Sequence, residues 1–205
     1  GTGLVAADRR TTGTQIDDEA IELRAASRIR ELATLGQISV TSYNRQVLLT
    51  GEVPGAAERT AVEQALVRVE GVRGVFNELV VAPNSAFSSR SADGVLSTKV
   101  KATLVDAKDV QANAYKVVAE RGIVYLMGRV TEREAERGTE LARSVKGVGK
   151  VVRAFELMSE RELANLSRSA AAPTAAPPVS SPTATPVSAP APQLAPMPAP
   201  TPVTK

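Results

Sequence analysis

The sequence contains no cysteine, no histidine and no tryptophan. Without thiolates or imidazoles, it can form no disulfide and none of the usual zinc sites, and it lacks the commonest general base of enzymes. It also has no Gly-rich phosphate loop, no nucleophile elbow, and no apolar run of about 18 residues, the length that a membrane-spanning helix needs. These absences argue against an enzyme and against a membrane-spanning chain. We therefore expect no catalytic residue, no metal and no cofactor.

Aromatic side chains are scarce, with three tyrosines and three phenylalanines in 205 residues, and the net charge is only +3. Nucleic-acid platforms need aromatic rings for stacking and a strong basic patch, so we expect no nucleic-acid partner. The absence of cysteine identifies no compartment, because it suits a reducing cytosol and an oxidising periplasm equally well.

Proline is distributed unevenly along the chain. Only Pro54 and Pro83 precede residue 170, and the other prolines of the total of 13 follow it. The stretch from Ser169 to Lys205 consists mostly of Ala, Pro, Ser, Thr and Val with one charge at its end, a composition that cannot offset the entropy cost of folding. We expect a disordered or polyproline-like tail, preceded by a short helical extension over residues 160–168. The tail could act as a spacer, a docking strip or a passive extension.

The remaining part contains one pattern twice. Each copy has a β-rich run interrupted by a single glycine, then an amphipathic helix, a glycine that supplies a left-handed helix cap, and a last strand. In the first copy these elements are 46–53, 56–69, Gly71 and 74–81. In the second copy they are 123–130, 132–145, Gly147 and 150–157.

Another amphipathic helix and a short strand open each copy. The helices are expected at Asp18–Leu35 and Asp93–Ala107, and the strands at Ile38–Tyr43 and Ala114–Ala119. The acidic run at residues 17–19 suits a helix N-terminus, where the helix dipole favours negative charge. Each copy therefore has the order α-β-β-α-β, which predicts an α+β fold with a three-stranded mixed sheet packed against two helices on one face.

These patterns divide the chain into five parts. We expect an N-terminal linker at 1–16, a first module at 17–82, a linker at 83–92, a second module at 93–158, and the helical extension and tail at 159–205.

The two glycine-bearing segments, Val47–Val53 and Val124–Ala135, resemble the BON domain. Two such copies after the segment Asp8–Thr11 resemble the dual BON-domain outer-membrane lipoproteins of Gram-negative bacteria. The resemblance covers roughly residues 8 to 158. No single motif in it suffices, but the set is specific.

This resemblance implies a periplasmic lipoprotein that is anchored to the inner leaflet of the outer membrane by an acylated cysteine preceding Gly1. It also implies contact with anionic phospholipid through the first helix of the second BON domain, enrichment at division sites and support of outer-membrane integrity. The partners would be an anionic membrane and envelope or division-site proteins. Two alternatives stay open: an envelope protein-interaction scaffold, and a soluble osmotic-stress periplasmic BON protein that binds no membrane.

The two copies differ in charge. Residues 17–82 contain 7 Lys/Arg and 10 Asp/Glu, a net charge of −3, whereas residues 93–157 contain 12 Lys/Arg and 9 Asp/Glu, a net charge of +3. An anionic bilayer would attract the second copy and repel the first, and each basic residue near such a surface contributes about 1 kcal/mol. The alternative explanation is unselected drift of net charge between the two copies.

The helix at 93–107 carries two stripes. One stripe, assigned to the core, consists of Leu96, Val100, Thr103, Leu104 and Ala107. The second is a small apolar stripe with lysines in it or beside it, which suits a helix resting among lipid headgroups while lysine stems reach the phosphates. The expected lipid-binding residues are Val95, Leu96, Thr98, Lys99, Lys101, Ala102, Val105 and Lys108, of which Leu96 also belongs to the core stripe.

One position departs from the family. Where the dual BON-domain lipoproteins carry an exposed interfacial tryptophan, this chain has Val95. Valine lacks the amphipathic ring that favours the headgroup level, so membrane affinity would be weaker or depend more on the lysines. The alternative for this helix is an ordinary solvated face.

Overall fold

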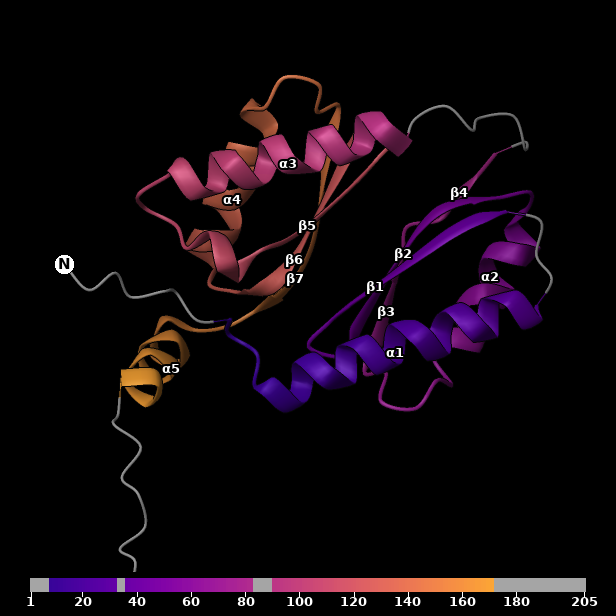
Figure 1. Ribbon diagram of the computed structural model, residues 1–205, viewed down its shortest axis with the longest axis horizontal. Coiled ribbons are helices and arrows are strands. Elements are labelled where there is room, and N and C mark those ends of the chain that lie inside the picture. The colour runs from indigo at the N-terminus through magenta and orange to yellow at the C-terminus, as the bar shows by residue number, and fades with distance from the viewer. Residues whose placement is uncertain (1–7, 33–35, 83–89, 172–205) are drawn as a thin grey trace, which may run out of the picture. The chain divides into compact units, whose positions relative to one another are not determined.

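A computed structural model describes residues 8–32, 36–82 and 90–171 of the chain. It confirms the α+β class and the order of elements in each copy (Figure 1). The first copy comprises α1 (Thr12–Glu31), β1 (Gln37–Tyr43), β2 (Gln46–Val53), α2 (Ala56–Leu66), β3 (Gly74–Asn77) and β4 (Val80–Val81).

The second copy repeats this order and adds a helix. It comprises α3 (Arg90–Asp106), the 3-10 turn η1 (Ala112–Ala114), β5 (Lys116–Glu120), β6 (Ile123–Val130), α4 (Glu132–Ser144), β7 (Lys150–Leu157) and α5 (Glu160–Ala171). The helical extension, expected over residues 160–168, thus continues to Ala171. The tail prediction for 172–205 and most of the linker prediction, at 83–89, lie outside the described residues.

Both sheets are mixed, as predicted. The central strand of each pairs antiparallel with the strand before it and parallel with the strand after the second helix, in the orders β1-β2-β3 and β5-β6-β7. The strand expected at 74–81 is interrupted, so that β3 and β4 both pair with β2 but Glu78 and Leu79 lie outside the ladder. Its counterpart β7 pairs with β6 over all eight residues.

The glycine inside each central strand has a steric role. Gly51 has φ 115° and Gly128 has φ 151°, values that residues with a side chain rarely adopt. A Cβ at Gly51 would overlap the carbonyl oxygen of Gln37, and one at Gly128 would overlap that of Ala114. The glycines therefore permit a close approach between the start of one strand and the end of the next. Gly51 departs further from extended backbone, and the interruption between β3 and β4 lies beside it.

The first helix begins earlier than predicted. It starts at Thr12, with Thr11 as N-cap, so the acidic run at 17–19 lies inside α1 instead of at its N-terminus. The reason is tertiary, because Asp18 is buried and its carboxylate accepts hydrogen bonds from the backbone N–H groups of Asn44 and Arg45, each at 2.8 Å. The Asp18 carboxylate therefore stabilises the β1–β2 turn and does not cap a helix.

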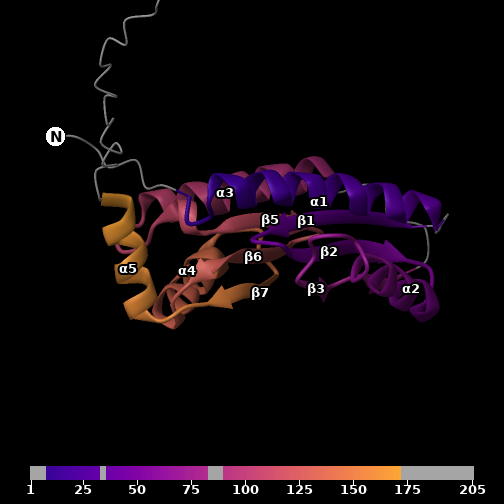
Figure 2. The ribbon, with the colours of Figure 1, turned by 90° about the horizontal axis from the view of Figure 1, so that it is seen from below.

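In each copy, the two helices pack on one face of the sheet. In the first copy, alternate β2 residues pack with α1 and α2 residues into a core of Ile21, Ala25, Val47, Leu49, Val53, Val62, Leu66 and Leu79. The second copy builds the equivalent core from α3, α4 and β6. Figure 2 shows α1 next to β1 and α2 on the side of β3. The predicted placement of two helices on one sheet face is therefore confirmed.

The opposite faces of the two sheets pack against each other. A third apolar cluster joins Tyr43 and Leu48 of the first copy to Tyr125, Met127 and Ala154 of the second. The central strands β2 and β6 are consequently buried on both faces, which explains why each is an almost continuous apolar run instead of an alternating one.

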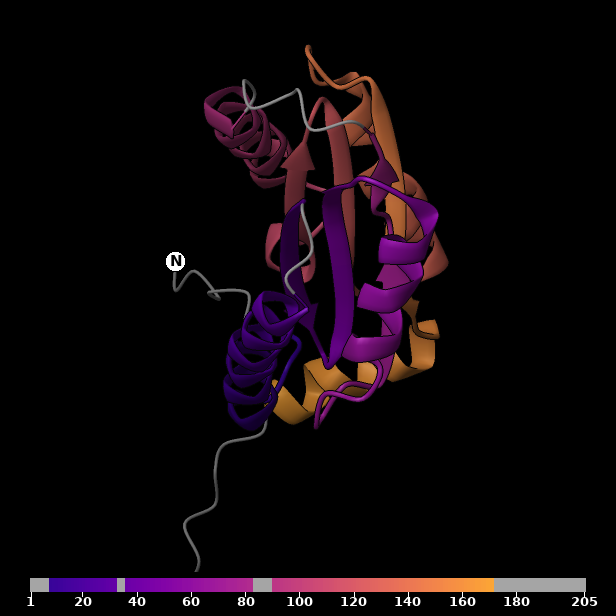
Figure 3. The same cartoon turned by 90° about the vertical axis from the view of Figure 1, so that its right-hand side faces the viewer.

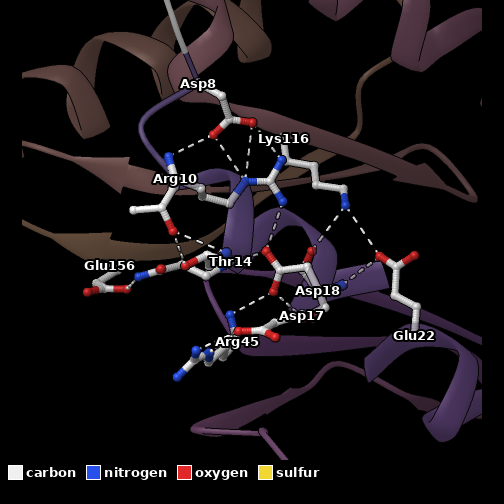
Figure 4. A network of polar contacts seen from close by, with 12 residues as sticks. Asp8, Arg10, Thr14, Asp17, Asp18, Glu22, Arg45, Lys116 and Glu156 are labelled. Carbon is white, nitrogen blue, oxygen red and sulfur yellow. Dashed lines mark hydrogen bonds and ion pairs between the residues drawn. The ribbon is translucent and has the colours of Figure 1, made fainter. Parts of the chain in front are cut away.

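The N-terminal segment Asp8–Arg10 contacts both copies. Arg9 donates to both carboxylate oxygens of Glu134, at 2.9 and 2.6 Å, and to the carbonyl oxygen of Arg129 at 2.8 Å. Arg10 binds Asp18 at 2.9 Å, and its guanidinium lies 4.4 Å from the centre of the Tyr43 ring. Figure 4 shows Arg10 between Asp8 and Asp18. This segment, expected to be a linker, therefore fastens the first copy to the second.

Further polar contacts between the copies surround this segment. Lys116 pairs with Glu22 at 3.3 Å, Asn44 donates to Glu156 at 2.7 Å, and Arg121 pairs with Glu52. Burial raises the pKa of the Tyr43 hydroxyl at this junction to about 12, so the ring stays neutral at physiological pH.

Candidate functional site

The two stripes predicted for the first helix of the second copy are present on α3. Leu96, Val100 and Leu104 are buried in the core beneath the helix. Val95 and Val105, on the second stripe, are 55 % and 66 % exposed. Thr98, Lys99 and Ala102 between them are also exposed. The helix therefore presents a small apolar face to solvent on the side away from its sheet.

Leu96 is the predicted site residue that the structure places elsewhere. Its side chain is 7 % exposed and packs with the core. Because it follows Val95 by one residue, it is rotated by about 100° around the helix axis, which directs it inward. The other seven residues lie on the surface, and Lys108 follows α3 in a turn. We define this surface, Val95, Thr98, Lys99, Lys101, Ala102, Val105 and Lys108, as the α3 face.

The threonine on the α3 face is less polar than its hydroxyl group suggests. The Thr98 hydroxyl donates to the carbonyl oxygen of Gly94 at 2.9 Å, the bond to the preceding helical turn that threonine commonly makes. Its hydrogen is therefore already used within the helix. The methyl group adds to the apolar surface between Val95 and Ala102.

The lysines of the α3 face are exposed and take part in no ion pair of the described residues. Among the ion pairs of the described residues, none involves Lys99, Lys101 or Lys108. Three ammonium groups are thus available beside a small apolar face, and this arrangement suits an anionic surface with an apolar interior.

An open hollow adjoins the N-terminal half of α3. It has a volume of about 450 Å³ and is lined by Ala92, Asp93, Val95, Leu96, Lys99, Gly122, Lys146 and Gly147. Two of its residues, Lys146 and Gly147, come from the loop after α4, and Gly122 comes from the β5–β6 turn. Lys99 and Lys146 therefore stand at one hollow although 47 positions separate them in sequence.

Asp93 fixes the wall of this hollow. Its carboxylate accepts a hydrogen bond from the backbone N–H of Arg121 at 2.8 Å, which joins the first part of α3 to the β5–β6 turn. The contact repeats the one that Asp18 makes to Arg45 in the first copy.

The sequence patterns marked Gly147 as a helix cap but indicated neither Lys146, Gly122 nor Gly147 as a site residue. The signal that could have found them was the left-handed glycine at Gly147, because a glycine cap turns the chain sharply and brings the residue before it back toward the sheet edge.

The described residues include no group of three or more Asp or Glu side chains placed to hold a metal ion. Within the same residues, no helix has the length and apolar content required to cross a membrane.

Comparison with known proteins identifies two matching regions. The BON domain family model matches residues 17–83 and 92–158. The chain is 38 % identical over 157 residues to the outer membrane lipoprotein DolP of Haemophilus influenzae, covering 75 % of this chain and 81 % of that protein. It is 34 % identical over 149 residues to the 21 kDa hemolysin of Actinobacillus pleuropneumoniae, covering 71 % and 77 %. It is 28 % identical over 144 residues to the osmotically-inducible protein Y of Escherichia coli, covering 68 % and 72 %.

Proposed function

This chain belongs to the BON domain family as a DolP-like member, and we propose from this premise that it is an envelope lipoprotein of the periplasm that contacts anionic phospholipid through the α3 face. The similarity to an outer membrane lipoprotein supports a location at the outer membrane. Within this proposal the protein lies at the inner leaflet of that membrane and supports its integrity. We take residues 17–82 and 93–158 as its two functional modules.

One observation carries the proposal. The α3 face combines exposed apolar side chains, Val95, Ala102 and Val105, with lysines that form no ion pair among the described residues. Within the described ranges, Val95 and Val105 are each more than half exposed, so much of this apolar surface faces water. In the interfacial zone of a bilayer the valines would reach the acyl boundary while the ammonium groups meet phosphates.

The division of charge between the copies supports the same orientation. The second copy, with a net charge of +3, would face the membrane, and the first, with −3, would face away from it. Because the N-terminal segment and the sheet-to-sheet cluster hold the two copies together, the membrane contact of α3 would also position the first copy.

Vesicle binding of the full chain tests this proposal. We expect the protein to float with vesicles containing phosphatidylglycerol, to remain unbound with vesicles of phosphatidylcholine alone, and to be released as salt screens the attraction. Equal binding to the two vesicle types, or binding to neither, would contradict it. Binding to neither would favour the second candidate, a BON protein without membrane contact, which the similarity to the osmotically-inducible protein Y supports.

Replacement of Val95 by tryptophan should strengthen vesicle binding. Val95 is more than half exposed on α3, so a larger ring can be accommodated without entering the core. Tryptophan prefers the headgroup level, and we expect about threefold to tenfold tighter binding to anionic vesicles. Titration with phosphatidylglycerol vesicles measures the change. The control is Val67→Trp, at an exposed valine in the first copy, which should leave the affinity unchanged.

A further inference from the structure

A second surface lies in the first copy, between α1 and β1. Here β1 is an edge strand, because the sheet order β1-β2-β3 gives it a neighbour on one side only. Figure 3 shows α1 beside β1 along this edge. The space between them is an open groove of about 730 Å³, lined by Glu19, Glu22, Leu23, Ala26, Ile29, Arg30, Gly36, Ile38 and Val40.

The backbone of β1 faces this groove at alternate residues. The N–H of Ser42 donates to the carboxylate of Glu22 at 2.8 Å, and its carbonyl oxygen accepts from Lys116 at 3.1 Å, so the polar backbone groups of Ser42 point away from β2. Residues two and four positions earlier face the same way in a strand. Ile38 and Val40 are those residues, and both line the groove.

The two ends of β1 are therefore different. At Ser42 the edge is closed by side chains from α1 and β5. At Ile38 and Val40, no hydrogen bond from the other described residues reaches the outward backbone groups. An exposed strand edge of this kind is a template for pairing with another extended chain.

The walls of the groove indicate which chain would fit. Leu23 of α1 is 74 % exposed, and Ala26 and Ile29 continue the apolar wall along the helix. Glu19 and Glu22 add negative charge at the end near Ser42, and Glu19 forms no ion pair among the described residues. Arg30 stands at the other end, beside Gly36. The groove thus offers apolar contact along its length and, at one end, the carboxylate of Glu19 beside that of Glu22, which already pairs with Lys116.

We propose that this groove binds an extended segment of a partner protein by adding it as a strand to β1, and that the segment carries apolar residues and a basic residue at alternate positions, on the face turned toward α1. Its backbone pairs with Ile38 and Val40. On the face turned toward α1, its apolar side chains contact Leu23 and Ile29, and a lysine or arginine meets Glu19. This activity is independent of the α3 face, which lies on the other copy.

The test uses the full chain and a fluorescent, end-capped heptapeptide of sequence Lys-Thr-Val-Thr-Val-Thr-Val, in which the lysine and the valines share one face of the strand. Fluorescence anisotropy measures the affinity, and amide chemical shifts locate the bound peptide. We expect saturable binding, shifts confined to α1 and β1, and no binding by the same peptide with glutamate in place of lysine. N-methylation of alternate peptide bonds should also abolish binding, because it removes the backbone donors.

Two variants and one control define the groove. Val40→Pro removes the outward N–H and spares the β1–β2 ladder, since proline is tolerated on edge strands, and it should weaken binding about tenfold. Glu19→Lys changes an exposed helix residue with little risk to folding and should weaken binding about threefold or more. Glu70→Lys, the same charge change in the same copy outside the groove, should leave binding unchanged.

Any of three results overturns the proposal. The first is no peptide binding by the wild-type chain. The second is binding that Val40→Pro and Glu19→Lys leave intact. The third is light scattering that shows dimers which Val40→Pro abolishes, because β1 would then pair with a second copy of the chain.

Discussion

Glu134→Gln should lower the free energy of unfolding by about 3 kcal/mol, the cost typical of breaking one side of a buried ion pair. Glu134 and Arg9 form a bidentate pair whose side chains are only 4 % and 6 % exposed. Glutamine has nearly the same shape and can still accept from the backbone N–H of Thr131, but it leaves the Arg9 guanidinium buried without its counter-charge. Urea unfolding followed by circular dichroism measures the loss.

The matched control is Glu136→Gln. Glu136 lies two residues along the same helix and is exposed, so its replacement should change stability by no more than about 0.5 kcal/mol. A double-mutant cycle adds Arg9→Met. The double variant should be more stable than the sum of the single losses predicts, by about 1 kcal/mol or more, because neither charge is then left alone. Strictly additive losses would show that the pair does not couple the N-terminal segment to α4.

The same pair predicts how stability depends on pH. Burial alone would raise the pKa of the Glu134 carboxyl, but hydrogen bonds from Arg9 and Thr131 outweigh it and hold the pKa below its ordinary value of 4.5. Because the folded-state pKa is the lower one, this contribution is complete above pH 4.5 and is lost as the pH falls through the folded value. Glu134→Gln should therefore lose less stability than the wild type between pH 5 and pH 3. Parallel curves would contradict this assignment.

Lys99→Glu combined with Lys101→Glu should abolish binding to anionic vesicles while leaving the fold intact. Each lysine near an anionic surface contributes about 1 kcal/mol, and reversing both charges removes this attraction and adds repulsion of similar size. The total of about 4 kcal/mol corresponds to roughly a thousandfold weaker binding. Both side chains are exposed, so circular dichroism and thermal unfolding should change little.

The control for this double variant is Arg30→Glu with Arg68→Glu. It makes the same change in net charge, but on exposed residues of the first copy. Flotation with phosphatidylglycerol vesicles should be retained, apart from a small effect of overall charge. If the α3 variant binds as well as the wild type, another surface carries the membrane contact.

The candidate site was partly predictable because its signal is local. A helix displays its faces at a fixed rotation of about 100° per residue, so the separation of Leu96 and Val100 from Val95 and Val105 follows from spacing alone. The hollow was not predictable in the same way. Its lining joins α3 to Gly122 and Lys146, and only the packing of α3 on its sheet determines which loops come to stand beside it.

The start of α1 shows how tertiary structure can override a local signal. Three acidic residues in a row favour a helix N-terminus by the dipole argument, yet Asp18 is buried where it accepts backbone hydrogen bonds from the β1–β2 turn. Pairing the buried Asp18 carboxylate with two backbone N–H groups outweighs a dipole interaction at an exposed terminus. The true N-cap, Thr11, carries no charge, and only its hydroxyl bond to the N–H of Thr14 distinguishes it.

The tandem repeat, the order of elements and the two faces of α3 were determined by the sequence alone, because periodicity and glycine position are properties of neighbouring residues. Three features were decided by tertiary structure: the sheet-to-sheet cluster around Leu48 and Met127, the hollow at Lys99 and Lys146, and the Arg9–Glu134 pair. Each depends on residues far apart in the chain, and Arg9 and Glu134 are 125 positions apart. Polar contacts are stronger where they are buried away from water. Local sequence patterns do not predict which two distant residues will be buried against each other.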